Sequence, residues 1–342
     1  MPPLNIAVIG AGSWGTTFAV RMARPAPGGR RVTLYEHFPQ VARDIAKRRE
    51  NRLFLPKVVL PRDLAVSNDL AACVGDADVV FNAVPTQFVR GVYRSLCRGD
   101  SEMTWNGKIL VNLSKGIEVK TGKIISQLFR ELFPKLLPSQ YAALSGPSHA
   151  EEVIRDIPTA VVVAGEKRTA AQIQKMVADK HFRLYTNDDV TGVELAGALK
   201  NCIALASGIC VGLGFGDKTL AAIMTRGLAE ISRLGVAMGA RPETFMGLAG
   251  LGDLVVTCSS PHSRNRRFGE LLAQGQSPKS ICRKYRFVAE GVATSKAAVR
   301  MATKAGVEIP IIGEVYNIIY RSKSVRRSVE SLLARPIRPE RA

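Results

Sequence analysis

The sequence lacks paired cysteines. Its six cysteines are scattered, with no CxxC pair and no spacing typical of metal ligands. This excludes a zinc ribbon and a disulfide scaffold, and we predict no metal site. Several of the cysteines stand in apolar runs, where a free thiol behaves as a small hydrophobe. We therefore expect a reduced, cytoplasmic compartment.

Acidic and aromatic residues are also scarce. The chain has 29 Asp+Glu against 48 Lys+Arg, a formal net charge of +19, and only 6% aromatic residues. Such a surplus attracts nucleic acid, anionic membranes or phosphorylated metabolites. Nucleic-acid binding usually interleaves basic residues with exposed aromatics, whereas the basic residues here are spread along the chain. We predict no nucleic-acid partner, and the basic surface suits small anionic substrates.

No apolar run is long enough to predict a membrane span. The most hydrophobic run, about 202–213, is too short, and Glu194, Lys200 and Asn201 precede it. The opening "MPPLNIAVIGAG" has no basic signal-peptide region and enters a strand pattern directly.

The 342 residues favour two domains over one. In the first half, Ile- and Val-rich runs such as "LNIAVIG", "ADVVFNAV", "KILVNLS" and "TAVVVAG" alternate with helical patterns. This alternation predicts an α/β domain with a doubly wound parallel sheet over residues 1–188. From residue 189 to 342 the pattern is helical throughout, with one long apolar helix over 190–214 and an Arg-rich tail.

The first strand leads into a dinucleotide fingerprint. Gly10, Gly12 and Gly15 have the G-x-G-x-x-G spacing, directly after an apolar strand and at the start of a helix. These glycines permit a tight turn, close approach of a pyrophosphate, and close helix–strand packing. The amides of Ser13 and Trp14 would face the phosphates. The alternative is an ordinary tight strand–helix turn.

The end of the second predicted strand bears on cofactor choice. Glu36 lies 21 residues after Gly15, where a carboxylate binds the ribose 2′-hydroxyl and repels a 2′-phosphate. This favours NAD over NADP. His37, with Arg43 or Lys47, could still meet a 2′-phosphate, so NADP stays open.

Polar residues are rare in the long apolar helix. Within 192–212 they are Glu194, Lys200, Asn201 and Ser207. Glu194 and Asn201 are seven residues apart, as are Lys200 and Ser207, so each pair lies on one face of the helix. A buried ammonium is costly, and burial lowers its pKa toward a range useful for proton transfer. Lys200 is therefore a candidate proton donor and acceptor; the alternative is a structural ion pair between helices.

Two further motifs follow core strands. "NLSKGIE" places Lys115 at the carboxyl edge of the predicted sheet, and "SGPSHAEEV" places Gly146, Ser148 and His149 after another strand. Open α/β sheets bind ligands at this edge. The alternatives are an ordinary loop lysine and a helix N-cap.

The ordered set of motifs resembles the bacterial-type NAD(P)-dependent glycerol-3-phosphate dehydrogenases. The strings that carry the resemblance are "GAGSWGT", "NLSKGIE", "SGPSHAEEV", "ELAGALKN", "TRGLAEISRLG", "FMGLAGLGDLVVTC", "SRNRRFG" and "VAEGVATSKA". The resemblance covers about residues 4–330 and implies a Rossmann domain followed by a helical domain of the 6-phosphogluconate-dehydrogenase-like type. It implies reversible reduction of dihydroxyacetone phosphate to sn-glycerol 3-phosphate with NAD or NADP, for glycerophospholipid synthesis, by a cytoplasmic homodimer.

The resemblance also implies roles for individual residues. Lys200 matches the proton donor and acceptor, Lys115 a residue at the junction of substrate and nicotinamide, and Asp253 an active-site polar residue. Together with these three, the implied substrate contacts are Gly146, Ser148, Ser263, Arg264 and Asn265. Besides the fingerprint, Glu36, His37 and Lys115, the implied cofactor contacts are Ala150, Arg264, Val288 and Glu290.

Other readings remain. A 3-hydroxyacyl-CoA dehydrogenase or a ketopantoate reductase has the same architecture, but no separate motif set for either is present. A non-catalytic nucleotide-sensing module is the third possibility. The arginines of "SRNRRFG" fit a small anion best, with Ser263, Arg264 and Asn265 opening a helix toward a phosphate and Arg266 and Arg267 in supporting or surface roles.

Overall fold

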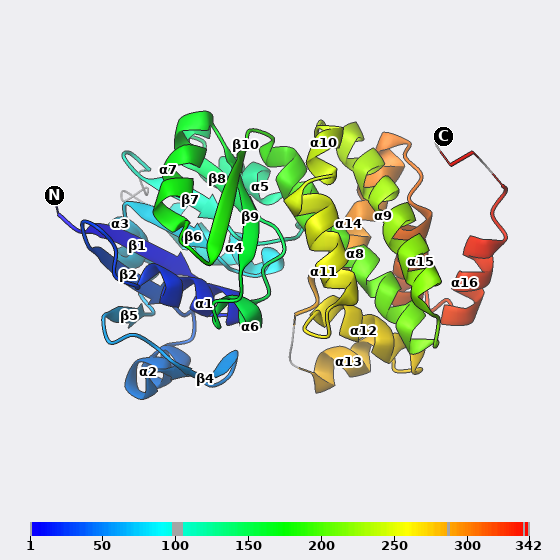
Figure 1. The fold of residues 1–342 in the computed structure, drawn as a ribbon, viewed down its shortest axis with the longest axis horizontal. Helices are drawn as coiled ribbons and strands as arrows, with labels where there is room; N and C mark the ends of the chain where they lie inside the picture. The colour runs from blue at the N-terminus through cyan, green and yellow to red at the C-terminus, as the bar shows by residue number, and fades with distance from the viewer. Residues whose placement is uncertain (1, 98–104, 286–287, 338, 341–342) are drawn as a thin grey trace.

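A computed structural model describes residues 2–97, 105–285, 288–337 and 339–340 of the chain. The chain forms two lobes side by side, with the N-terminus at the far end of the first lobe and the C-terminus at the far end of the second (Figure 1). The strands are β1 (Leu4–Ile9), β2 (Arg30–Tyr35), β3 (Glu50–Asn51), β4 (Leu55–Val59), β5 (Leu64–Ser67), β6 (Val79–Asn82), β7 (Ile109–Asn112), β8 (Tyr141–Ser145), β9 (Thr159–Gly165) and β10 (Phe182–Asn187).

Helices cover the sheet and build the second lobe. The helices of the first lobe are α1 (Ser13–Met22), α2 (Pro39–Arg48), α3 (Leu70–Gly75), α4 (Thr86–Tyr93), η1 (Arg94–Cys97), α5 (Ile125–Leu132), η2 (Pro138–Gln140), α6 (Ala150–Val153) and α7 (Lys167–Val177). Those of the second are α8 (Val190–Gly212), α9 (Asp217–Ala237), α10 (Pro242–Phe245), η3 (Leu248–Gly252), α11 (Asp253–Ser259), α12 (Arg264–Ala273), α13 (Pro278–Lys284), α14 (Glu290–Ala305), α15 (Pro310–Tyr320) and α16 (Val325–Leu333). Every strand in the described part of the chain ends by Asn187, so the helical second half is confirmed.

The main sheet has the order β10-β9-β8-β7-β6-β1-β2-β5. Its central strands are apolar on both faces because helices cover both: buried residues of α1, α2 and α7 pack on one face, and those of α3, α4 and α5 on the other. This confirms the doubly wound α/β domain predicted from the sequence.

One strand direction departs from the predicted parallel sheet. β9 pairs antiparallel with β8, and β10 pairs parallel with β9, so the last two strands run opposite to the rest. The chain between β8 and β9 contains only the four-residue helix α6, which contacts α1. Because no helix crosses a face of the sheet here, the chain re-enters from the edge at which β8 ends.

Helix α8 forms the axis of the second lobe. Asp189 caps it by accepting a hydrogen bond from the Gly192 amide (2.8 Å). By length and composition its 23 residues could cross a membrane, but 89% of its most apolar window is buried inside the protein. Helices α9, α11, α12, α14 and α15 surround it, so the hydrophobicity of α8 serves the core of this lobe.

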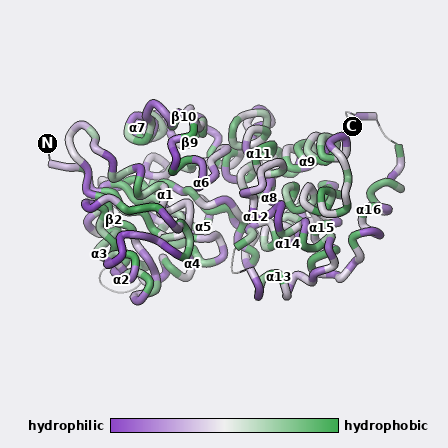
Figure 2. Tube along the Cα trace, turned by 60° about the horizontal axis from the view of Figure 1, so that its bottom comes forward, coloured by the Kyte–Doolittle hydropathy of each residue, from purple (hydrophilic) through white to green (hydrophobic). Residues whose placement is uncertain are grey.

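The two lobes share one apolar core. Phe129 of α5 and Tyr141 of β8 belong to the same buried cluster as the α8 residues Val193 and Leu199. Hydrophobic stretches lie in the interior of both lobes, while α16 lies at the outer edge of the second (Figure 2). This shared core holds α8 against the carboxyl edge of the sheet.

Candidate functional site

The turn between β1 and α1 has the shape of a dinucleotide cradle. Gly10 has φ +111, and an added Cβ would lie 3.0 Å from the Ala83 backbone; a Cβ at Gly15 would lie 1.9 Å from the Gly10 carbonyl oxygen. In contrast, a Cβ at Gly12 would meet no atom of the described residues within 4 Å. Gly12 is the N-cap of α1, so the amides of the first turn face open space rather than a capping side chain. The turn therefore fits a pyrophosphate.

Residues around this turn brace it. Ser13 and Trp14 form the start of α1, and the Trp14 ring tilts against Phe18 (centroids 5.8 Å apart). The Asn51 side chain donates hydrogen bonds to the Ala11 carbonyl oxygen and to Thr16 Oγ1, both at 2.8 Å. The sequence gives no signal for Asn51, because the short hairpin of β3 and β4 has no strong strand pattern.

The Glu36 side chain is held in a fixed position at the end of β2. It is buried, and its Oε1 accepts a hydrogen bond from the Phe38 amide (3.0 Å). His37 is exposed, and its Nδ1 lies 3.2 Å from the Tyr35 hydroxyl. A fixed carboxylate at this strand end is the arrangement expected for binding a ribose 2′-hydroxyl.

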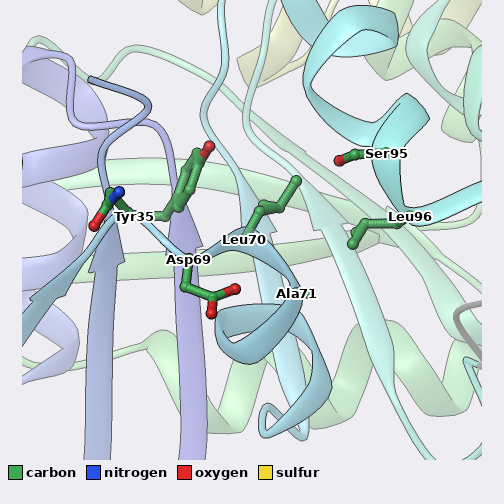
Figure 3. Close-up of a pocket in the computed structure, with 7 residues that line it drawn as sticks. Tyr35, Asp69, Leu70, Ala71, Ser95 and Leu96 are labelled. Carbon is green, nitrogen blue, oxygen red and sulfur yellow. The ribbon is translucent and has the colours of Figure 1, made fainter. Parts of the chain in front are cut away.

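An open hollow of about 630 Å³ is lined by Tyr35, the last residue of β2, and by residues of α3 and η1. Figure 3 shows Tyr35, Asp69 and Leu70 on one side of it and Ser95 with Leu96 on the other. None of its lining residues is among the predicted cofactor contacts.

Two lysines share one carboxylate between the lobes. Lys115, from the loop after β7, donates to Asp253 Oδ2 (2.8 Å), and Lys200 of α8 donates to Asp253 Oδ1 (2.9 Å). Lys200 also donates to Thr257 Oγ1 at 2.5 Å, and both Lys200 and Asp253 are buried. Thr257 was not predicted, although its position four residues after Asp253 places both on one face of α11.

Charge and burial compete in this cluster. Burial lowers the pKa of Lys200 to about 8; the Asp253 carboxylate opposes this effect and the Lys115 ammonium adds to it. Burial alone would raise the pKa of Asp253, but Lys115 and Lys200 outweigh it and lower that pKa. Asp253 therefore stays ionised, and Lys200 can gain and lose a proton near neutral pH.

The loop after β8 lies against the same cluster. The Gly146 carbonyl oxygen accepts hydrogen bonds from Lys115 Nζ (2.8 Å) and Ser148 Oγ (3.0 Å). Gly146 has φ +133, and a Cβ there would lie 2.9 Å from Val161 Cα, so the position requires glycine. Ser148 is not the N-cap of α6; His149 is, without a side-chain capping bond, and Ala150 begins the helix. This rules out the alternative in which Ser148 is a helix cap.

The "SRNRRFG" motif begins helix α12. Ser263 is its N-cap and accepts a hydrogen bond from the Arg266 amide (3.2 Å), while Arg264 is exposed. Arg266 and Arg267 both pair with Glu270, in agreement with supporting roles. The opening of a helix at this motif is as predicted.

The Asn265 carboxamide is largely engaged within the protein. Its Nδ2 donates to Asn201 Oδ1 (2.9 Å), and its Oδ1 accepts from the Gly291 amide (2.9 Å). Asn201 Nδ2 in turn donates to the Lys115 carbonyl oxygen (3.1 Å). Among the described residues one N–H of Asn265 is thus left for a ligand, and a chain of hydrogen bonds joins α12, α14, α8 and the Lys115 loop.

The predicted late cofactor contacts lie at the start of α14. Val288 is exposed, whereas the Glu290 carboxylate reaches the first lobe and accepts a hydrogen bond from the Thr86 amide (2.8 Å). Burial raises the pKa of Glu290 to about 6, against the Thr86 hydrogen bond. Thr86 begins α4, just after the Ala83 backbone that Gly10 approaches, so Glu290 lies on the nucleotide side of the lobe junction.

The Glu194 carboxylate is bound by residues of the first lobe. Its carboxylate accepts hydrogen bonds from Asn112 Nδ2, the Ser126 amide and hydroxyl, and the Tyr141 hydroxyl. Burial raises the pKa of Glu194, and these four bonds oppose that effect. Glu194 therefore fixes α8 to the sheet, although the heptad spacing placed it on one face with Asn201.

Comparison with known proteins agrees with this geometry. Residues 5–171 match the family model for the NAD-dependent glycerol-3-phosphate dehydrogenase N-terminus, and residues 189–330 match that for its C-terminus. The chain is 45% identical over 339 residues to a glycerol-3-phosphate dehydrogenase (NAD(P)+) of Chlorobium luteolum, covering 99% of this chain and 100% of the relative. A relative of the same name from a Geobacter species is 47% identical over 340 residues, covering 98% of each chain.

Solved structures point the same way. The crystal structure of glycerol-3-phosphate dehydrogenase from Coxiella burnetii has a TM-score of 0.90 and 32% identity, covering 97% of this chain and 99% of that one. A 2-dehydropantoate 2-reductase from Geobacter metallireducens, with a TM-score of 0.59 and 13% identity over 94% of this chain and 100% of that one, shares the fold alone. The chain therefore belongs to the NAD-dependent glycerol-3-phosphate dehydrogenase family.

Proposed function

We propose that this protein catalyses the reversible NAD(P)-dependent reduction of dihydroxyacetone phosphate to sn-glycerol 3-phosphate. The observation that carries the proposal is the cluster of Lys115, Lys200 and Asp253 between the nucleotide turn and the start of α12. We assign residues 1–188 to dinucleotide binding and residues 189–342 to substrate binding and catalysis.

The cofactor site has the chemistry that NAD or NADP requires. The open space over Gly12 accepts a pyrophosphate at the N-terminus of α1, where Ser13 and Trp14 supply amides. Glu36 favours a free 2′-hydroxyl and hence NAD. When bound, the nicotinamide supplies or accepts the hydride.

The lysine cluster stabilises the negative charge that develops on the carbonyl oxygen. As the ketone carbon takes up hydride, negative charge develops on its oxygen, and the ammonium groups of Lys115 and Lys200 stabilise it. Lys200 then donates a proton to that oxygen and becomes a neutral amine; in the reverse direction the neutral amine accepts the proton of the alcohol. The ionised Asp253 holds both lysines in place.

Substrate orientation is assigned to two loops. Ser263, Arg264 and the free N–H of Asn265 hold the substrate phosphate at the N-terminus of α12. Gly146 and Ser148 line the substrate side of the lysines, and Ala150, Val288 and Glu290 contact the cofactor. Binding energy from a phosphate remote from the reacting carbon positions the carbonyl group for hydride transfer.

The cellular setting completes the proposal. The enzyme acts as a homodimer in the cytoplasm and supplies sn-glycerol 3-phosphate for glycerophospholipid synthesis. The basic surface, with a net charge of +19, draws in anionic substrate and cofactor.

The test is NADH and NADPH oxidation with dihydroxyacetone phosphate and, separately, unphosphorylated dihydroxyacetone. We expect turnover with the phosphorylated ketone only, a preference for NADH, and loss of turnover in Lys200→Ala with NADH still bound. Lys304→Ala, at an exposed position on α14, is the matched control and should retain full activity. Equal rates with both ketones would refute the phosphate site, and an active Lys200→Ala enzyme would return Lys200 to a structural role.

A further inference from the structure

Two histidines face each other across the junction of the lobes. His149 follows β8 at the N-cap of α6, and His262 immediately precedes Ser263, the N-cap of α12. Their ring centroids are 6.1 Å apart, with an angle of 59° between the ring planes. The chain has only four histidines, so this pairing brings half of them to one side of the candidate site.

The His149 ring is not satisfied within the protein. Its Nε2 is buried, and no hydrogen-bond partner for it exists among the described residues. A buried polar atom without a partner is costly and rare, and a bound ligand or ion is one way in which such an atom is satisfied. His262 is exposed, and its amide donates to Ser260 Oγ (3.1 Å), which holds its loop beside the start of α12.

The charges around His149 narrow the identity of that ligand. The charged side chains that act on its ring are Lys200 of α8, Asp253 of α11, Lys115 of the loop after β7, and Glu151 of α6. Burial, followed by Lys200, lowers the pKa of His149 despite the opposing carboxylate of Asp253. A neutral imidazole beside two ammonium groups is well placed to donate one hydrogen bond to an anion.

The phosphate is the anion that the geometry favours. The proposed mechanism already gives the carbonyl oxygen of the substrate two donors, Lys200 and Lys115, whereas His262 is adjacent to Ser263, the N-cap of α12. We propose that His149 is a further substrate-binding residue, whose Nε2–H donates to the substrate phosphate, and that His262 borders the same anion site. This inference rests on the proposed function, since it takes the phosphate of a triose phosphate as its ligand.

Substitution at His149 tests the inference. His149→Phe keeps a flat ring and removes the donor, whereas His149→Gln places an N–H near the position of Nε2. Because a hydrogen bond to a charged group is lost, the Phe variant should raise KM for dihydroxyacetone phosphate about 10- to 100-fold, with a much smaller change in kcat. The Gln variant should stay within about threefold of the wild type in KM. His181→Phe, on the loop before β10, is the matched control and should change neither constant.

Inorganic phosphate gives a readout that does not depend on turnover. Calorimetric titration of the protein with inorganic phosphate and with NADH should show phosphate affinity falling in His149→Phe, persisting in His149→Gln, and NADH affinity equal in all. Equal phosphate affinity in the Phe variant and the wild type overturns the inference, as does a fall in kcat without a rise in KM. Equal losses in the Phe and Gln variants also overturn it, because they assign His149 a packing role. If the wild type does not reduce dihydroxyacetone phosphate at all, the proposed function fails, while the phosphate titrations still decide the role of His149.

Discussion

Replacing Asp253 by asparagine should change the pH at which this enzyme works. The substitution keeps the size of the side chain and removes the one negative charge shared by Lys115 and Lys200. At 2.9 Å and an effective dielectric constant near 20, that charge attracts the Lys200 ammonium by roughly 6 kcal/mol, equivalent to about four pH units. The amide oxygen of asparagine retains part of this attraction, so we expect a change of ~2 pH units or more.

The consequence for reduction of dihydroxyacetone phosphate can be worked out with its sign. In the proposed mechanism reduction needs protonated Lys200, whose pKa is about 8, so kcat of the wild type should hold up to that pH and fall above it. In Asp253→Asn the fall begins about two pH units lower, which reduces kcat about tenfold at pH 7 and about 100-fold above pH 8. Near pH 5 the two enzymes should approach each other. Oxidation of sn-glycerol 3-phosphate needs neutral Lys200, so its rising limb should also move to lower pH.

The assay is kcat against pH from 5 to 9 in both directions, with NADH binding and thermal unfolding as checks on folding. Thr257→Val is the control, because it removes an uncharged hydrogen-bond partner of Lys200 and leaves the ion pair in place. Its profile should move by less than about one pH unit. A constant ratio of wild-type to Asp253→Asn activity across the pH range would refute the claim that Asp253 sets the protonation of Lys200.

Four further substitutions separate cofactor binding and cofactor choice from stability. The Cβ of Gly12→Ala meets no described atom within 4 Å, so thermal unfolding should be unchanged, while titration should show NADH affinity about tenfold weaker. The Cβ of Gly15→Ala would lie 1.9 Å from the Gly10 carbonyl oxygen and should destabilise the fold by ~1–3 kcal/mol. A destabilised Gly12→Ala with normal NADH affinity, beside a stable Gly15→Ala, would contradict the assignment of this turn to the pyrophosphate. Glu36→Gln removes the charge that repels a 2′-phosphate, so the ratio of kcat/KM for NADPH to that for NADH should rise, and an unchanged ratio would exclude Glu36 from cofactor choice. Glu194→Leu removes a carboxylate that accepts four hydrogen bonds, so chemical denaturation should show a loss of ~2–5 kcal/mol, with KM of the folded enzyme nearly unchanged.

The local pattern of apolar and polar residues predicted most helices and strands, but it did not predict the contacts between them. Buried runs such as those of β1, β6 and β7 are visible as Ile- and Val-rich segments, because strands covered on both faces need apolar residues throughout. The hairpin of β3 and β4 is short, and a proline and a lysine interrupt β4, so it left no such signal. The direction of β9 depends on where α6 packs, which local pattern does not encode.

The candidate site shows the same division. A lysine in the middle of an apolar helix singled out Lys200, since burial of an unpaired ammonium is costly. The resemblance supplied Asp253, but the sharing of its two oxygens between two lysines is visible only in three dimensions. The hydrogen bond between Asn201 and Asn265 joins residues 64 apart, and no periodicity predicts it.

If Lys200 is the proton donor proposed above, the shared carboxylate of Asp253 also has a consequence for successive turnovers. Two ammonium groups and one carboxylate give the cluster a net charge of +1 before reduction, and donation of a proton by Lys200 leaves it neutral. Lys200 is only 5% exposed and Asp253 only 2%, so the proton must be restored through a nearly closed interior before a second reduction can begin. Until then, the cluster is in the state that accepts a proton from an alcohol. In the proposed mechanism, whether this one buried amine holds a proton thus decides in which direction the next catalytic cycle can run.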